Sequence, residues 1–422
     1  MSNNSLSYSI INDLYLLNRN FCSSDYEKSM EYLCSLLPFT VHDFHSPKPN
    51  LGWEIPPKWD LIQATLSFNG QEIFKAAHPL HVIGLSTSFQ GNVPLDELKQ
   101  HLHFDHRDPT AIPYHFRQNY RPWKRTWGFC VPKEFYDSLQ PGLYEVLIET
   151  KESEGYLKVL EYVKKGDNPE SFVFVAHLDH PGMANDDLSG VAVAVEFFKE
   201  LQHRKTKFSY TLLLLQEIIG SAYYLNNAPR EHLLEGCFID QVGTKNSLFF
   251  QQSSHGDSAF DHVLKGNLKG KCEPFRSLVC NDEIVWESFG ISMPSLLRHP
   301  PPEYHSDRDN MDIISSASLR ETVDLLKKLV GSLDQMHLLI KNFQGYPSLS
   351  NPQYNLYIDP GQPAFGEMSS DSIKKLRSLM DLIPILPKRS FVEQIARDLQ
   401  LERDQVLDVL RRWQAKKLIE IV

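Results

Sequence analysis

The sequence predicts an α/β fold built on a largely parallel sheet, and two stretches carry that prediction. In residues 172–201 a short apolar run, FVFVA, leads into a polar loop and then into apolar residues at helical spacing. Thr211–Leu215 is a second apolar run, TLLLL, which also ends in polar residues. The order strand, polar loop, helix is typical of a parallel sheet, in which ligands gather at the carboxyl ends of the strands.

Length and composition limit the kind of protein. A chain of 422 residues is too long for one core, so we expect two or three domains. A hydrophobic content of 41% and a charged content of 23% are ordinary for a soluble globular protein. The formal net charge of −10 disfavours non-specific binding of nucleic acid or membrane by the whole molecule.

The sequence predicts a cytoplasmic protein that does not enter a membrane. No apolar run reaches the roughly 18 residues of a membrane span, and residues 1–17 lack the basic start of a secretory signal. The six cysteines are scattered without C-x-x-C pairs, as expected of free thiols in a reducing compartment.

The chain changes character along its length. Residues 1–40 have apolar positions at helical spacing, which predicts two helices. Residues 41–145, rich in proline and aromatic residues, predict a small β domain of short strands. From about 146 the α/β pattern starts with LYEVLIET and continues through GCFIDQVG (236–243) and ISMPSLLR (291–298).

The C-terminal part begins with a predicted amphipathic helix over residues 318–343, which would close the α/β domain. Residues 346–369, rich in proline and polar residues, predict a linker. Residues 370–422 predict three helices and a short strand, an order that resembles a winged helix-turn-helix domain.

DNA is a less favoured partner for this C-terminal domain. The first half of its recognition helix carries Glu402, Asp404 and Asp408, where base edges would be met. Packing against protein, or dimerisation, is the favoured role. A homo-oligomer formed through this domain or through the small β domain is one arrangement left open.

Three polar motifs follow the predicted strands. His177, Asp179 and His180 come directly after the first apolar run, and Asn185-Asp186-Asp187 lies before the helix. Imidazole and carboxylate groups clustered at strand ends suit a divalent cation such as zinc. The alternative for Asp186 and Asp187 is an ordinary helix N-cap.

The second and third motifs strengthen the metal hypothesis. Gln216-Glu217 ends the second apolar run and precedes Gly220-Ser221, and His305 lies in the loop PPPEYHSDRDNMD (300–312). Together with His-x-Asp and Asp-Asp-x-Ser-Gly, these motifs resemble the di-zinc aminopeptidase family in their order along the chain.

This resemblance implies a zinc-exopeptidase fold, a mixed sheet flanked by helices, formed by residues 1–40 and 146–345. Residues 41–145 resemble the small β domain inserted into aminopeptidase-like proteins often met with polysaccharide-biosynthesis genes. The motifs that carry this are Trp53 to Trp59, His101-Leu102-His103, Ile112-Pro113-Tyr114 and Trp127 to Cys130.

The resemblance also implies a set of ligands for one or two zinc ions. Asp186 would bridge two metals. His177 and Asp240 would hold one of them, and Glu217 and His305 the other. Asp179 would orient His177, and Asp282 competes with Asp240 for its place.

The chain departs from the family at Gln216, where the family has the glutamate that acts as general base. A glutamine cannot take up a proton at neutral pH. The base is then Glu217 or Glu283, or the hydrolase is weakened. Loss of a general base typically costs roughly 10² to 10⁴-fold in rate, so residual metal catalysis would remain.

The sequence therefore predicts a zinc-dependent hydrolase of peptide or amide bonds, foremost an aminopeptidase acting on a peptide or an amino-acid amide. The alternative is a catalytically weak protein that binds an amino-acid-like ligand and signals through its winged helix. The histidines at 101, 103, 106 and 115 fit no standard metal spacing and are predicted to be polar surface.

Overall fold

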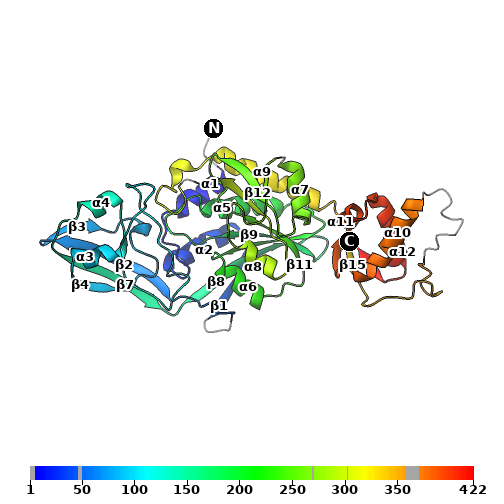
Figure 1. Cartoon of the computed structure of the whole chain (residues 1–422), viewed down its shortest axis with the longest axis horizontal. Helices are drawn as coiled ribbons and strands as arrows, with labels where there is room; N and C mark the ends of the chain where they lie inside the picture. Colours follow the sequence, from blue (N-terminus) through cyan, green and yellow to red (C-terminus); the bar gives the residue numbers. More distant parts are fainter. Residues whose placement is uncertain (1–4, 46–49, 269, 302, 358–369) are drawn as a thin grey trace. The chain divides into compact units, whose positions relative to one another are not determined.

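The computed structural model describes residues 5–45, 50–268, 270–301, 303–357 and 370–422 (Figure 1). The chain forms two compact units, Met1–Lys328 and Leu329–Val422. Among the described residues, no helix is long and apolar enough to cross a membrane.

An eight-stranded mixed sheet dominates the first unit, in the order β1-β8-β10-β9-β11-β14-β12-β13. The four central neighbours β10, β9, β11 and β14 run parallel to one another. The flanking pairs β1–β8, β8–β10 and β12–β14 are antiparallel. The strands are β1 (Thr40–His45), β8 (Tyr156–Lys164), β9 (Ser171–His177), β10 (Ser209–Leu215), β11 (Leu233–Ile239), β12 (Ser247–Gln251), β13 (Cys272–Glu273) and β14 (Ser295–His299).

Helices cover both faces of this sheet, which explains why every residue of β9 and β10 is buried. On one face, Phe174 of β9 packs edge-on against Phe197 and Phe198. On the other face, the cluster that contains Val173 and Val175 also contains aromatic residues of α6 and α8. The helices of this unit are α1 (Leu6–Leu14), α2 (Ser24–Leu36), α5 (Leu188–Leu201), α6 (Ile219–Asn227), α7 (Ala259–Asn267), α8 (Glu283–Ser288) and α9 (Ser316–Leu333).

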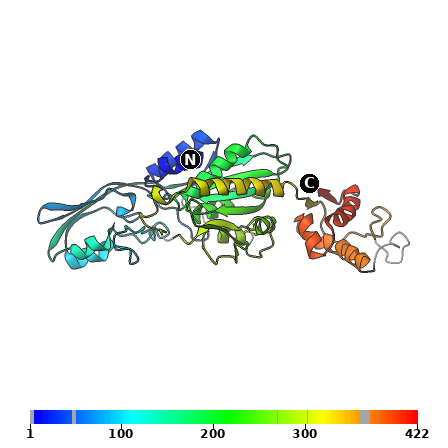
Figure 2. The ribbon, with the colours of Figure 1, turned by 90° about the horizontal axis from the view of Figure 1, so that it is seen from above.

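A second, antiparallel sheet is built mainly from the segment predicted to be a small β domain. Its order is β3-β2-β7-β4, and it extends away from the large sheet in both views (Figures 1 and 2). The elements of this region are β2 (Lys58–Phe68), β3 (Gln71–Lys75), β4 (Phe89–Pro94), α3 (Leu95–Leu98), β5 (Leu102–His103), β6 (Phe129–Cys130), α4 (Lys133–Ser138) and β7 (Leu143–Ser153).

The two sheets divide the chain differently from the sequence boundaries at 41 and 145. Strand β1 pairs with β8 in the large sheet. The stretch LYEVLIET, expected to open the α/β pattern, is instead β7, which pairs with β2 and β4. Its residues alternate between exposed and buried, so that Tyr144, Val146 and Ile148 face the core. Such alternation is typical of an antiparallel sheet with one solvated face.

The helix predicted over residues 318–343 is too long. Helix α9 ends at Leu333, and Leu338–Lys341 form strand β15. This strand lies between β16 and β17 and is antiparallel to both. Pairing with residues about 50 and 80 positions further along overrides the helical periodicity.

The second unit combines the three-stranded sheet β16-β15-β17 with three helices. Its core gathers Leu339 and Trp413 with apolar residues from the helices. The expected linker is described only over residues 346–357, since residues 358–369 lie outside the described part of the chain. The remaining elements are α10 (Ser370–Leu382), β16 (Arg389–Phe391), α11 (Val392–Asp398), α12 (Arg403–Ala415) and β17 (Ile419–Ile421).

Candidate metal centre

The carboxyl ends of the four central strands bring the polar motifs together. His177 is the last residue of β9, Glu217 follows β10, and Asp240 directly follows β11. His305 lies in the loop after β14. Because these strands are parallel neighbours, their carboxyl ends meet at one edge of the sheet, as the sequence predicted for such side chains.

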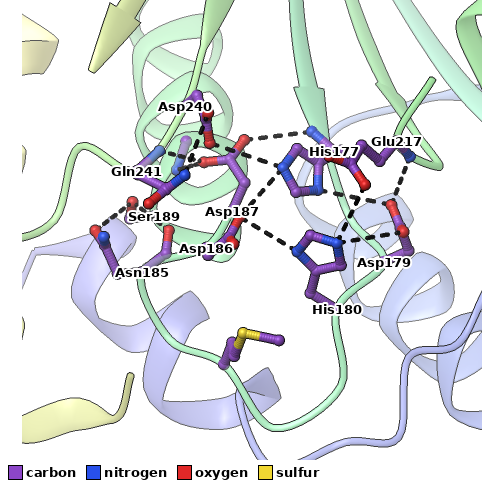
Figure 3. Close-up of polar contacts among 12 residues, drawn as sticks. His177, Asp179, His180, Asn185, Asp186, Asp187, Ser189, Glu217, Asp240 and Gln241 are labelled. Carbon is purple, nitrogen blue, oxygen red and sulfur yellow. Dashed lines mark hydrogen bonds and ion pairs between the residues drawn. The ribbon is translucent and has the colours of Figure 1, made fainter. Parts of the chain in front are cut away.

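Asp186 lies at the centre of the cluster (Figure 3). Its Oδ1 is 3.3 Å from Nε2 of His177 and 3.2 Å from Nδ1 of His180. Its Oδ2 is 3.2 Å from Nε2 of His305. The two oxygens of one buried carboxylate therefore face different imidazoles, as a carboxylate that bridges two cations would require.

The other carboxylates flank these imidazoles. Oδ1 of Asp240 is 3.7 Å from Nε2 of His177. On the opposite side of the same ring, Oδ1 of Asp179 is 3.6 Å from Nδ1 of His177. Oε2 of Glu217 is 3.4 Å from Nε2 of His180. The structure thus brings together His177, Asp179, Asp186, Glu217, Asp240 and His305.

The neighbouring Asp187 has a different role, because its carboxylate accepts hydrogen bonds from backbone N–H groups. It caps helix α5 by accepting a 3.0 Å hydrogen bond from the N–H of Gly190. The same carboxylate accepts hydrogen bonds from the N–H of Gln241, at 2.9 Å, and of His177, at 3.3 Å. Asp187 is therefore the helix cap of the alternative interpretation, whereas Asp186 faces the imidazoles. The cap ties together the strand ends that carry His177 and Asp240.

Two buried side chains fix the loop between β9 and α5. The carboxylate of Asp309 accepts hydrogen bonds from the N–H groups of residues 184–186, including a 2.9 Å bond from Asp186. Arg19 lies in the segment between α1 and α2. Its guanidinium donates hydrogen bonds to the carbonyl oxygens of Leu178, at 3.0 Å, and His180, at 2.7 Å. Arg19 was not recognisable as a partner from the sequence, because it lies more than 150 residues from the loop.

The segment between β5 and β6 also reaches the cluster. The hydroxyl of Tyr120 donates a short hydrogen bond to Oε2 of Glu217. The N–H of Tyr114 donates a 2.9 Å bond to the carbonyl oxygen of His305, and its ring lies edge-on to that imidazole. The region predicted to be an insertion therefore orients two of the candidate ligands.

The charges of the cluster are strongly coupled. Burial alone would lower the pKa of His177, but contacts with Asp179, Asp186 and Asp240 raise it well above its usual value. Burial would raise the pKa of Glu217, but the hydrogen bond and the charge of His180 lower it to about 2. Burial raises the pKa of Asp240 above its ordinary value. The shifts of His177 and Glu217 thus show imidazole and carboxylate groups that stabilise each other's charge.

The chemistry of the donor set fits zinc. Several buried atoms of the cluster have no hydrogen-bond partner among the described residues, and a cation would satisfy them. Imidazole nitrogen and carboxylate oxygen are both common zinc ligands. These atoms are His177 Nδ1 and Nε2, His180 Nδ1, Asp179 Oδ2, both carboxylate oxygens of Asp186, Asp240 Oδ1 and His305 Nε2.

Gln216 lies outside the cluster. Its side chain is fully buried, and its Nε2 donates a 3.0 Å hydrogen bond to the carbonyl oxygen of Phe21. The chain turns sharply after β10, so that Glu217 faces the imidazoles and Gln216 faces the N-terminal segment.

The other two carboxylates predicted near the site, those of Glu283 and Asp282, accept hydrogen bonds from backbone N–H groups. Both oxygens of Glu283 lie 2.9 Å from the N–H of Asn281, and burial raises its pKa to about 7. Asp282 accepts hydrogen bonds from the N–H of Ile218, at 3.0 Å, and from the hydroxyl of Ser221. Asp282 therefore fixes the turn after Glu217, and Asp240 is the aspartate that faces His177.

The histidines of the β region are not part of any three-residue group of potential metal ligands within the described chain. The ring of His101 stacks on Trp127 at 3.7 Å between centroids. The rings of His103 and His115 lie 4.2 Å apart, and burial lowers the pKa of both. Of the four, only His106 is exposed, so three of them are half-buried rather than surface residues.

Similar proteins define the class of this fold. The Bacillus subtilis zinc aminopeptidase BSAP shares the fold with a TM-score of 0.58 and 15% identity, over 78% of this chain and 94% of that one. A Clostridium acetobutylicum protein, whose crystal structure is described as that of a peptidase, has a TM-score of 0.74 at 22% identity. The match covers 99% of this chain and 96% of that one. The large mixed sheet flanked by helices is therefore the aminopeptidase fold, as predicted.

The family follows from the sequence itself. The model of the family described as "Domain of unknown function (DUF4910)" matches residues 8–336, so the chain belongs to this family. A Clostridium acetobutylicum relative, named for polysaccharide biosynthesis and an aminopeptidase-like domain, is 27% identical over 344 residues. This match spans 78% of this chain and 77% of the relative.

Proposed function

We propose that the protein is a zinc-dependent hydrolase of peptide or amide bonds, of the aminopeptidase type. The observation that carries this proposal is the position of Asp186, whose two oxygens face His177 and His305 at 3.3 and 3.2 Å. The fold shared with a zinc aminopeptidase supports it.

The residues divide into two groups around Asp186. His177 and Asp240 would hold one ion, and His305 and Glu217 would hold a second. Asp179 orients the imidazole of His177, and it accepts a 2.7 Å hydrogen bond from the N–H of Glu217. A zinc ion bound here would polarise the scissile carbonyl and increase the acidity of water.

Glu217 is the remaining candidate for the general base. Gln216 and Glu283 both bind backbone atoms outside the cluster, whereas the carboxylate of Glu217 faces His180. Of these three side chains it is the one that faces the candidate ligands, and its carboxylate could accept a proton from the attacking water. The hydroxyl of Tyr120 would hold this carboxylate in place.

The substrate would lie beside Asp240. A cavity of about 360 Å³ is lined by Asp240, Gln241, Asn281, Tyr304 and Arg107, among other residues. A peptide or an amino-acid amide bound in this cavity would have its scissile bond near the candidate ligand Asp240.

We also propose that the second unit is the winged helix expected from the sequence and that it binds protein. The exposed Arg403 and Arg411 of α12 each lie within ion-pair distance of an aspartate on the same helix, Asp404 and Asp408. This pairing reduces the positive charge that a DNA-reading helix needs.

The proposal is tested with the full-length protein after removal of metals by a chelator. Addition of Zn²⁺ or Co²⁺ should restore release of amino acids from a panel of peptides and amino-acid p-nitroanilides. The Asp186→Asn variant should show neither metal uptake nor turnover. Absence of metal binding by the wild-type protein at micromolar Zn²⁺ would refute the proposal.

A further inference from the structure

A third imidazole, that of His180, enters the cluster that the sequence motifs define. Its Nδ1 is 3.2 Å from Oδ1 of Asp186, and its Nε2 is 3.4 Å from Oε2 of Glu217 (Figure 3). Both nitrogens thus face carboxylates that are assigned to the metal centre. The ring is 4.6 Å from that of His177 and 5.3 Å from that of His305, between centroids.

The protein holds this imidazole in place at some conformational cost. His180 has a backbone φ of 121°, a value that side-chain-bearing residues rarely adopt. Its carbonyl oxygen accepts a 2.7 Å hydrogen bond from the buried Arg19. The ring of Tyr114 lies edge-on to the imidazole of His180, at 5.2 Å between centroids. Strained residues of this kind persist where the surroundings fix them, and they cluster at functional sites.

Hydrogen bonds do not account for the position of His180. The residue is 2% exposed, yet its Nδ1 lacks a partner with hydrogen-bond geometry despite the 3.2 Å approach to Asp186. A buried polar atom without a partner is costly. Three imidazoles, from His177, His180 and His305, therefore converge on the same carboxylate.

We propose that His180 is an additional ligand of the metal centre. This inference rests on the proposed function, because it presupposes that a divalent cation binds at Asp186. Imidazole is a common ligand of zinc, and His180 and Glu217 approach each other on one side of the cluster. With His180 as a nitrogen ligand, Glu217 would not be needed to hold the metal and could serve as the base in place of the glutamate that the family has at position 216.

The test compares metal binding by full-length variants stripped of metal. Zn²⁺ affinity is measured by competition with a chromophoric chelator, and the visible absorption of the Co²⁺-loaded protein reports the ligand field. His180→Ala should weaken the tightest Zn²⁺ affinity by more than about 100-fold, since loss of a merely orienting partner costs roughly 10–100-fold. It should also change the Co²⁺ spectrum. His203→Ala, at an exposed position, is the control and should change neither.

His180→Asn separates a ligand from a structural hydrogen-bonding residue. Its amide N–H can reach Asp186 much as Nδ1 does, but it cannot supply an imidazole nitrogen. As ligand loss predicts, His180→Asn should bind Zn²⁺ as weakly as His180→Ala. Wild-type affinity and spectrum in His180→Asn would overturn the inference, even if His180→Ala fails to fold. If the wild-type protein binds no metal, the proposed function itself fails. If it binds metal and His180→Asn binds equally well, only the role of His180 fails.

Discussion

The side-chain amide of Gln216 donates a 3.0 Å hydrogen bond to the backbone carbonyl oxygen of Phe21. Both groups are buried, and the residues are 195 positions apart in the chain. This contact explains the departure from the aminopeptidase pattern at residue 216 as a structural one. Gln216 joins the N-terminal segment to the large sheet, and Glu217 alone of the pair faces the imidazoles.

Gln216→Glu should therefore destabilise the protein and leave any hydrolase activity no higher than that of the wild type. The substitution replaces an N–H donor by a carboxylate that faces a carbonyl oxygen in a buried position. An unsatisfied buried polar group costs about 1–3 kcal/mol, and a charged one costs more. Urea denaturation followed by circular dichroism measures the loss.

The matched control is Gln140→Glu. Gln140 is exposed, and its amide also donates a 3.0 Å hydrogen bond to a backbone carbonyl, that of Ser138. Its free energy of unfolding should change little, because water can solvate the new carboxylate. A clear rise in turnover by Gln216→Glu would show that residue 216 reaches the substrate, contrary to its place in the structure.

His177→Ala and His305→Ala should each lower the zinc content of the full-length protein, as measured by inductively coupled plasma mass spectrometry after dialysis. Both imidazoles face Asp186, on opposite oxygens. His177→Ala should also be the less stable variant, because the His177 side chain is fully buried whereas that of His305 is 13% exposed. Unchanged zinc content in both variants would show that the metal binds elsewhere.

A chain that ends at residue 336 should fold, whereas one that ends at residue 345 should aggregate. The family match ends at 336, after helix α9 ends at Leu333. The longer chain retains β15 without β16 and β17, so both edges of an apolar strand are unpaired. Size-exclusion chromatography of the two proteins checks this. Insolubility of the shorter chain would show that the first unit requires the second.

The free energy of unfolding should fall as the pH rises from about 5 to 8, in part because of Glu235. Burial raises the pKa of this carboxyl to about 8, while the N–H of Ala259 donates a 2.8 Å hydrogen bond to it. In the unfolded chain this carboxyl has its ordinary pKa and loses its proton at a lower pH than in the folded protein. Between the unfolded and the folded pKa, the free energy of unfolding therefore falls as the pH rises. One such group changes stability by at most about 1.4 kcal/mol per pH unit.

Glu235→Gln should remove the part of the fall in unfolding free energy that Glu235 causes. The amide oxygen of glutamine still accepts the hydrogen bond, and the amide does not ionise. Urea denaturation at a series of pH values compares this variant with the wild type and with Glu145→Gln, an exposed control. If the stability profile of Glu235→Gln runs parallel to that of the wild type, Glu235 ionises freely in the folded protein.

The α/β fold was predictable from local sequence, and the resemblance to the aminopeptidase family implied most of the candidate site. Phe172–Ala176 and Thr211–Leu215 are apolar throughout, and a strand buried on both faces needs that composition. His177, Asp186, Glu217 and His305 follow such strands or lie in the loops next to them, so parallel pairing brings them to the same edge of the sheet. The alternation of exposed and buried residues in β7 is also visible in the sequence, although the prediction placed this strand in the large sheet.

Only the tertiary structure decided which polar residues face inward. Glu217 and Gln216 are adjacent, and a turn fixed by Asp282 directs Glu217 toward the imidazoles of the candidate site and Gln216 toward Phe21. His180 follows a recognised motif, but its role depends on a strained backbone held by Arg19. The direction of a loop side chain is set by contacts with distant segments, and the sequence of the loop does not encode them.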